Sequence, residues 1–227
     1  MPVHAPVFDE RTIKAELLTK LWREGSIDKT TVLTSEFRLQ NTGVRADIAI
    51  LTNHLTGVEI KSGKDSLKRL RQQMDVYRAY FDRVVLVVAP KHLASLAEID
   101  IVGVELWSID STKHFRMLKP GSICDNAAAR YAKMPERDRK RYAHLSERDA
   151  FDMIFRDRFH QTSDAFWKSI GRARRIPKDS LKYLSRFREK RELHIEWEHN
   201  QERRWVEWHR KASDAFSNNA SSDKTSD

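Results

Sequence analysis

The apolar run at residues 83–89 (RVVLVVA) constrains the fold more than any other segment of this sequence. A continuous run of β-branched and aliphatic residues is typical of a strand that is buried on both faces of a sheet. Amphipathic patterns at residues 9–23 and 65–81 predict helices that can cover such a sheet. The sequence therefore predicts an α/β or α+β layered domain with a mixed sheet.

Turn signals and apolar periodicity predict the remaining elements of this domain. Asp9 can cap the first helix, and the segment Asn41–Thr42–Gly43 is a good hairpin turn. The predicted order is a helix to about Arg23, strands over residues 31–40, 44–52 and 56–62, a helix over 65–81, a strand over 83–89, a further helix, and a strand over 103–109.

The chain carries an excess of positive charge, with a formal net charge of +9 over 227 residues. This excess favours polyanionic partners, with nucleic acid first and an acidic membrane surface second. A single cysteine, Cys124, excludes an intramolecular disulfide and a cysteine-rich zinc site. No apolar run reaches the roughly 18–20 residues of a spanning helix, and residues 1–8 lack the blocks of a signal peptide. We therefore expect a cytoplasmic protein that does not enter a membrane.

The charge is distributed unevenly, with a net +2 over residues 1–125 and a net +7 over residues 126–227. The second segment is charged and helical in pattern, whereas the first alternates strands and helices. Residues 217–227 have almost no apolar side chain and are expected to be disordered. We expect a folded core at 1–125, a basic helical region at 126–216 for substrate binding or oligomerisation, and a disordered tail at 217–227.

Charged side chains occupy alternate positions in the three strands that precede the apolar run. Because side chains alternate between the faces of a strand, Glu59 and Lys61 point away from their apolar neighbours. The same alternation places Asp47 and Glu36 opposite the apolar residues of their own strands. If the strands are neighbours, three carboxylates and one lysine converge on one sheet face. Carboxylate oxygens are the ligands that Mg²⁺ prefers, and a bound Mg²⁺ can activate water for attack on a phosphodiester.

Asp47 and the segment Glu59–Ile60–Lys61, which follows after eleven residues, resemble the D…ExK motif of the PD-(D/E)XK, or restriction-endonuclease-like, nuclease superfamily. Gln73 and Tyr77 match the Gln-x-x-x-Tyr spacing on the helix after this motif in RecB-like members. The resemblance covers residues 9–110 and is greatest to compact bacterial members. It implies a restriction-endonuclease-like core, in which helices flank a central mixed sheet.

The resemblance also implies roles for individual residues. Asp47 and Glu59 correspond to ligands of Mg²⁺, for which Mn²⁺ can substitute, and the Ile60 carbonyl to a further ligand. Lys61 corresponds to the catalytic lysine, and Gln73 to a residue that reaches into the site from the helix. The additional acid of the family is Glu36 or Glu16, of which strand facing favours Glu36. Arg45–Ala46 replaces the proline of the family motif, as in many members.

Basic residues follow the motif at helical spacing and have two interpretations. The stripe is either a solvated helix face or a track for phosphates, which would add affinity without base specificity. Its members are Lys64, Lys68, Arg71 and Arg78, with Arg69 beside them.

The C-terminal half has basic clusters at residues 137–141, 172–175 and 186–191, between amphipathic helices. These clusters either hold nucleic acid or lie on the surface of helices that dock on the core. We interpret the apolar stripes, including Trp197, Trp205 and Trp208, as core or interface rather than as platforms for bases. His194, His199 and His209 lack the spacing of a metal site and are interpreted as non-ligands. They are the last histidines of the chain.

The sequence thus predicts a metal-dependent nuclease that hydrolyses phosphodiester bonds, with DNA as the expected substrate and a homodimer as a possible assembly. With only seven glycines and no phosphate-binding loop, no nucleotide cofactor is expected. One alternative is a nucleic-acid-binding protein that has lost catalysis. The other is a module that docks on a partner in a phage, mobile-element or defence system.

Overall fold

The computed structural model describes residues 8–39, 42–185, 197 and 200–209. The chain divides into two compact units, residues 1–186 and residues 187–227. The described part of the second unit is helical at residues 200–209, where Trp205 and Trp208 are exposed. Within the described ranges, no helix combines the length and apolar character needed to cross a bilayer.

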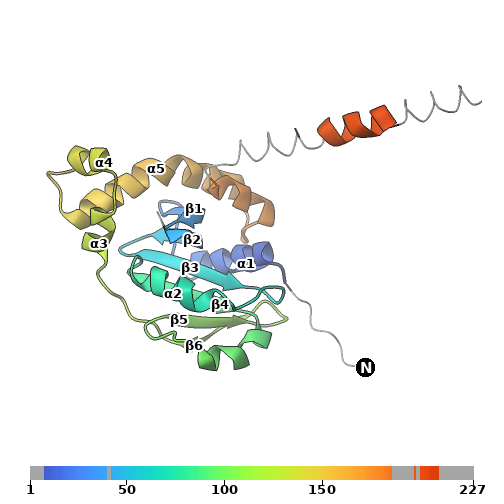
Figure 1. Ribbon diagram of the computed structural model, residues 1–227, viewed down its shortest axis with the longest axis horizontal. Helices are drawn as coiled ribbons and strands as arrows, with labels where there is room; N and C mark the ends of the chain where they lie inside the picture. Colours follow the sequence, from blue (N-terminus) through green and yellow to red (C-terminus); the bar gives the residue numbers. More distant parts are fainter. Residues whose placement is uncertain (1–7, 40–41, 186–196, 198–199, 210–227) are drawn as a thin grey trace, which may run out of the picture. The chain divides into compact units, whose positions relative to one another are not determined.

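A six-stranded mixed sheet forms the centre of the first unit, as the sequence predicts (Figure 1). Its strands lie in chain order, and their bounds are β1 Val32–Arg38, β2 Arg45–Leu51, β3 Leu55–Lys61, β4 Arg83–Val88, β5 Glu105–Ile109 and β6 Phe115–Lys119. The pairs β3–β4 and β4–β5 are parallel, whereas β1–β2, β2–β3 and β5–β6 are antiparallel. The fold class is therefore α/β, with helices flanking a central sheet.

Helices cover both faces of this sheet. Helix α1 (Glu10–Arg23), capped by Asp9, packs on one face, and α2 (Leu70–Arg78) packs on the other (Figure 1). Strand β4 contributes Val85 and Val87 to the α1 side and Leu86 and Val88 to the α2 side. This confirms that the apolar run is buried on both faces.

A glycine in β3 permits the close approach of the segment after α2. A Cβ atom at Gly57 would stand 2.2 Å from the Phe81 ring, well inside van der Waals contact. Just after Phe81, the carboxylate of Asp82 accepts hydrogen bonds from the Leu55 backbone and from the guanidinium of Arg130. Both charged side chains are fully buried, so this pair fixes α3 (Ala127–Ala132) to the sheet.

Three elements differ from the sequence prediction. Helix α2 begins at Leu70 rather than at residue 65, because the Asp65 carboxylate accepts a hydrogen bond from the Ser62 backbone and closes a turn. The helix expected after β4 consists of two 3₁₀ turns, η2 (Pro90–His92) and η3 (Ala94–Glu98). The edge strand β6 was not predicted, because only Phe115 of its residues is buried and the apolar alternation is missing.

The compact unit extends beyond residue 125, where the sequence analysis places the end of the core. After α4 (Glu136–Arg141), the long helix α5 (Glu147–Ile170) packs along β1 and is followed by η4 (Lys178–Leu184). The Ser163 hydroxyl of α5 accepts from the Leu33 N–H and donates to the Leu33 carbonyl, at 2.9 and 2.8 Å. Trp167 donates to the Thr31 carbonyl. Residues 126–185 are therefore part of the core fold. The tail at 217–227 lies outside the described residues.

Candidate active site

The candidate site lies where strands β2 and β3 separate. Their antiparallel pairing ends at Ile48 and Val58, so the next residues, Asp47 and Glu59, flank an opening between the strands. The Asp47 carboxylate accepts a hydrogen bond from the Ile60 N–H at 2.7 Å, where a backbone carbonyl would otherwise pair. The opening therefore brings Asp47 and Glu59 of the sequence motif into one place.

Side-chain alternation breaks in β1 and β2 at this same place. Leu33 belongs to the core on the α1 side, but Phe37, four residues later, belongs to the core on the α2 side. Between them, Glu36 has a φ of +56°, a left-handed conformation that non-glycine residues rarely adopt. In β2, Asp47 contacts α1 although its neighbour Ile48 also packs on that side. The break turns the carboxylates of Glu36 and Asp47 toward α1.

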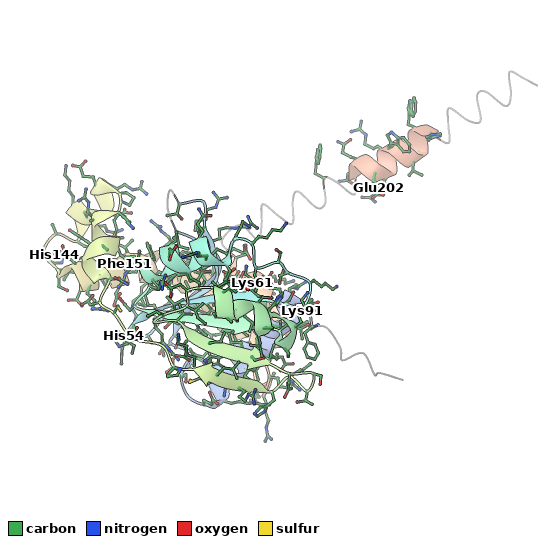
Figure 2. All side chains as sticks on the ribbon, turned by 60° about the horizontal axis from the view of Figure 1, so that its bottom comes forward. His54, Lys61, Lys91, His144, Phe151 and Glu202 are labelled. Atoms are coloured by element: carbon green, nitrogen blue, oxygen red, sulfur yellow. The ribbon has the colours of Figure 1, made fainter. Side chains whose placement is uncertain are left out.

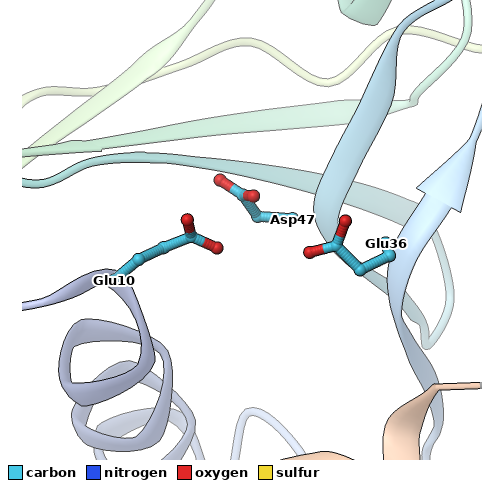
Figure 3. A group of neighbouring side chains, drawn as sticks. All are labelled: Glu10, Glu36 and Asp47. Atoms are coloured by element: carbon cyan, nitrogen blue, oxygen red, sulfur yellow. The ribbon is translucent and has the colours of Figure 1, made fainter. Parts of the chain in front are cut away.

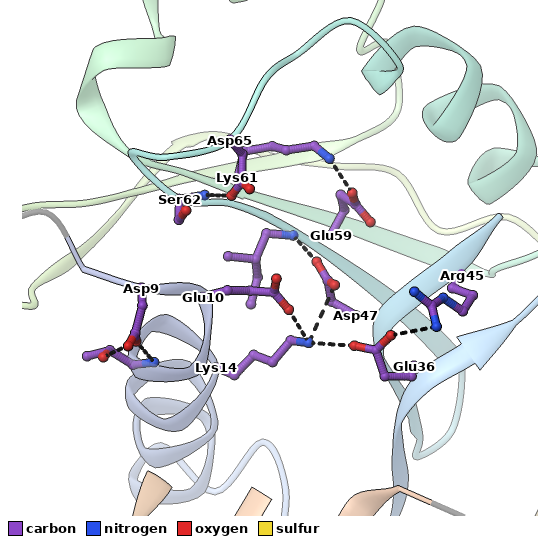
Figure 4. Close-up of polar contacts among 12 residues, drawn as sticks. Asp9, Glu10, Lys14, Glu36, Arg45, Asp47, Glu59, Lys61, Ser62 and Asp65 are labelled. Carbon is purple, nitrogen blue, oxygen red and sulfur yellow. Dashed lines mark hydrogen bonds and ion pairs between the residues drawn. The ribbon is translucent and has the colours of Figure 1, made fainter. Parts of the chain in front are cut away.

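Three carboxylates meet around one buried lysine at the start of α1 (Figures 3 and 4). Oxygen atoms of Glu10, Glu36 and Asp47 lie within 4.8 Å of one another. The Lys14 Nζ lies 3.2 Å from Glu36 Oε1 and 3.4 Å from Asp47 Oδ1, and it also pairs with Glu10. Lys14 is only 6% exposed. The ammonium thus occupies the space between the three acids.

Glu59 is held from the other side of the sheet. Its Oε1 accepts hydrogen bonds from Lys61 Nζ at 2.6 Å and from Gln73 Nε2 at 2.7 Å. Its Oε2 accepts from the hydroxyl of Tyr77, which is completely buried on α2. The Gln-x-x-x-Tyr pair therefore fixes the orientation of the buried glutamate.

The local charges perturb the titration of the site. Burial raises the pKa of the Asp47 carboxyl to about 8, and the charge of Glu59 adds to this effect against the opposing charge of Lys14. Burial lowers the pKa of Lys14, but the charges of Asp47, Glu10 and Glu36 outweigh it and raise that pKa above its ordinary value. Burial, followed by the Glu59 charge, raises the pKa of Tyr77. Tyr77 therefore remains a hydrogen-bond donor, and Asp47 is a carboxyl group that ionises near neutral pH.

Asp47 and Glu59 line a cavity of about 370 Å³. Its acidic residues outnumber its basic ones, five to three: Glu10, Glu36, Asp47, Glu59 and Asp65 against Arg45, Lys61 and Arg69. The Gln73 Oε1 is buried there without a hydrogen-bond partner among the described residues. An excess of hard oxygen atoms with one unsatisfied amide oxygen suits a divalent cation such as Mg²⁺.

All the residues predicted to be catalytic or to bind metal line this one cavity, although not as one cluster. These residues are Glu36, Asp47, Glu59, Ile60, Lys61 and Gln73. Glu36 and Asp47 turn toward α1, whereas the Glu59 carboxylate turns toward α2. The prediction that all three acids converge on one sheet face is therefore wrong, because the alternation of side chains breaks at Glu36 and Asp47. Glu16, the other candidate acid, lies elsewhere and pairs with Lys113 and Arg175.

The predicted basic stripe is not a stripe on one helix. Lys64 and Lys68 precede α2, because the Asp65 turn delays the start of the helix. Of the five basic residues, Arg69 lines the cavity, and Arg78 pairs with Asp75 and Asp100. Lys64, Lys68 and Arg71 are exposed. Lys61 is the last residue of β3, and Lys91 lies in η2, shortly after the parallel strand β4 (Figure 2).

Sequence reasoning missed Glu10 and Lys14. The available signal was their i,i+4 spacing combined with the position of Lys14 among apolar residues, since Ile13, Ala15 and Leu17 are all buried. A lysine in that position is unusual, because a buried ammonium needs carboxylate partners. The facing partners come from β1 and β2, which the pattern of α1 does not reveal.

The C-terminal residues contribute packing to the described structure. Phe151, Ile154, Phe155 and Phe159 form one buried stripe on α5, as expected. Trp205 and Trp208 are exposed, and both rings contact the His209 ring. The basic cluster at 186–191, together with His194 and His199, lies outside the described residues.

The fold and the site define a mixed α/β protein with an acidic cavity where two strands separate. The chain belongs to the Bacteriophage P4 protein cII family, whose model matches residues 4–143, more than half of the chain and all of the residues named around the cavity.

Among individual proteins, the chain is similar to protein cII of Enterobacteria phage P4, with 32% identity over 123 residues. The alignment covers 53% of this chain and 46% of that protein, so the chain matches slightly less than half of the relative's length. Among solved structures, it is similar to a protein of unknown function from Silicibacter pomeroyi, with a TM-score of 0.41 and 18% identity. That match covers 66% of this chain and 92% of the other.

Proposed function

We propose that this chain is a Mg²⁺-dependent nuclease of the PD-(D/E)XK superfamily that hydrolyses phosphodiester bonds in DNA. The observation that carries this proposal is the meeting of Asp47, Glu59 and Lys61 in one acidic cavity where β2 and β3 separate. Five elements, α1, β1, β2, β3 and α2, contribute residues to this cavity, whereas an unselected ion-pair cluster on a strand face would not require so many. The basic charge of the chain supports a polyanionic substrate.

The donor set fits the ion that the motif implies. Glu10, Glu36 and Asp47 offer carboxylate oxygens close enough together for a shared cation. A carboxylate has about four acceptor positions, and Lys61, Gln73 and Tyr77 occupy three of those on Glu59. These three donors therefore leave about one acceptor position of Glu59 for an ion. We assign Glu36 and Asp47, with Glu10 beside them, as the carboxylates that would hold Mg²⁺ or Mn²⁺, and Glu59 and the Ile60 carbonyl as further ligands from the adjoining strand.

The residues around the cavity have different roles in the proposed reaction. When bound, the ion supplies a Lewis acid that favours ionisation of water and offsets phosphate charge. Lys61, held 2.6 Å from Glu59, orients the attacking water and places positive charge beside the phosphate. Gln73 and Tyr77 keep Glu59, and through it Lys61, in a single orientation. Arg69 at the rim can bind a neighbouring phosphate.

Matched carboxamide variants test this assignment. Wild type, Glu59→Gln, Asp47→Asn and Glu16→Gln are incubated with linear, circular and single-stranded DNA in Mg²⁺, Mn²⁺ or EDTA. We expect cleavage by wild type and Glu16→Gln, its loss in EDTA, and a reduction of roughly 100-fold or more in the two cavity variants. Cleavage that is equal in all four proteins would assign the activity to a contaminant or to another site. Absence of cleavage by wild type with every DNA and ion would overturn the proposal.

One observation favours a second candidate, a nucleic-acid-binding protein without catalysis. Lys14 already balances charge among Glu10, Glu36 and Asp47, as the cavity of a metal-free protein would require. This candidate predicts DNA binding that falls with salt, is equal in wild type and Glu59→Gln, and is indifferent to EDTA. The third candidate, a partner-docking module of a phage system, accords with the family and predicts weak affinity for DNA.

A further inference from the structure

We infer that Lys14 is a displaceable internal cation, whose ammonium holds the Glu10, Glu36 and Asp47 carboxylates until a divalent ion replaces it and a substrate phosphate receives it. This inference rests on the proposed function. It adds a form of regulation to that function, because metal binding and DNA binding become coupled through one side chain.

The first step is competition for space. The Lys14 Nζ lies 3.2 and 3.4 Å from oxygens of Glu36 and Asp47, which in turn lie within 4.8 Å of each other and of Glu10. Mg²⁺ binds its oxygen ligands at about 2.0–2.1 Å. An ion that touches these three oxygens would lie where the ammonium now lies, so both cannot be present.

The second step is that Lys14 has no other partner of similar strength within reach in the described structure. Its ammonium contacts the same three carboxylates, and its side chain is 7% exposed. Removing an ammonium from such partners without a replacement leaves a buried unpaired charge, which is costly. Displacement by metal alone is therefore opposed by the fold.

The third step is that a phosphate removes this opposition. The lysine extends from α1 on a flexible four-carbon stem, so its head can move while the helix remains fixed. A phosphodiester at the cavity offers the displaced ammonium a new anionic partner, and the incoming ion supplies the charge that the carboxylates lose. Metal and substrate therefore bind with positive coupling, which thermodynamic linkage makes reciprocal.

The matched variants are Lys14→Met, which keeps the length and removes the charge, and Lys14→Arg, which keeps the charge. Lys20→Met on the same helix is the control, because Lys20 pairs with Glu24 away from the cavity. Mn²⁺ alone is the probe, measured by electron paramagnetic resonance of the free ion. We expect Lys14→Met to bind Mn²⁺ roughly tenfold more tightly than wild type, and Lys14→Arg and Lys20→Met to show no gain.

The coupling is measured in the Lys61→Met background, which keeps every residue assigned to hold the ion and in which a short DNA duplex should remain uncut. DNA should raise the Mn²⁺ affinity of the protein with Lys14, and this gain should disappear when Lys14→Met is added. Thermal unfolding with and without Mn²⁺ checks that each variant is folded and reports binding independently.

The outcomes separate the two claims. If wild type binds Mn²⁺ and folded Lys14→Met binds it equally tightly, the role of Lys14 is overturned and the proposed nuclease remains. If neither binds Mn²⁺, with or without DNA, the metal-dependent function itself is overturned.

Discussion

Replacement of Asp47 by asparagine removes a carboxyl group whose proton affinity differs between the folded and unfolded protein. In the folded protein its pKa is about 8, because burial and the charge of Glu59 oppose ionisation, whereas its ordinary value is 3.8. Between these values the folded protein retains a proton that the unfolded chain releases. The free energy of unfolding therefore falls as pH rises, by at most about 1.4 kcal/mol per pH unit from this group.

Urea unfolding between pH 5 and 8 measures this slope. In EDTA, we expect wild type to lose stability across the range and Asp47→Asn to lose markedly less. Carboxyl groups with a lowered pKa, such as Asp82, make the free energy of unfolding rise with pH instead. They do so below about pH 4, outside this range. Mg²⁺ should raise the free energy of unfolding of wild type most near pH 8, because fewer protons compete with the ion for the Asp47 carboxylate there. Equal slopes for the two proteins in EDTA would refute the assigned environment of Asp47.

Three further predictions concern the packing that supports the site. Arg130→Met leaves the fully buried Asp82 carboxylate with Arg148, at 3.3 Å, as its remaining charged partner, and should cost an amount near the lower end of about 3–5 kcal/mol in urea unfolding; a cost below about 1 kcal/mol would contradict the burial of this pair. Gly57→Ala forces a methyl group into the Phe81 ring and should cost about 1–3 kcal/mol, with partial recovery when Phe81→Leu is added; no recovery would place the strain elsewhere. Phe155→Ala, on the buried stripe of α5, should lower the free energy of unfolding by about 3–5 kcal/mol in one cooperative transition; loss of α5 alone, with the sheet intact by circular dichroism, would show that the helix is a separate unit.

Local patterns in the sequence were sufficient for most of the sheet and for part of the site. Asp9 caps α1, and the alternation in β3 places Glu59 and Lys61 on one side, where they contact each other. The family resemblance implies that Gln73 reaches into the site from its helix, and both Gln73 and Tyr77 donate to Glu59. These features depend on short stretches of chain, so periodicity and motif spacing reveal them.

The rest depends on contacts between distant segments. Glu36 adopts a positive φ that no local rule assigns to a glutamate, and this reverses the face of the residues around it. Lys14 becomes part of the site because carboxylates from β1 and β2 surround it. The stripe of α5 was recognised as apolar, but its partner on β1, the Phe37 ring, is more than 100 residues away in the chain.

The outer side of β1 has a consequence for synthesis of the protein. The Leu33 N–H donates a hydrogen bond to Ser163, which is synthesised 130 residues later. At translation rates of 5–20 residues per second, this strand is made roughly 6–26 s before the helix that covers it. During that interval an uncovered strand edge can pair with another nascent chain. Protein made in cells should therefore respond to chaperone supply and to translation speed more strongly than its final stability implies.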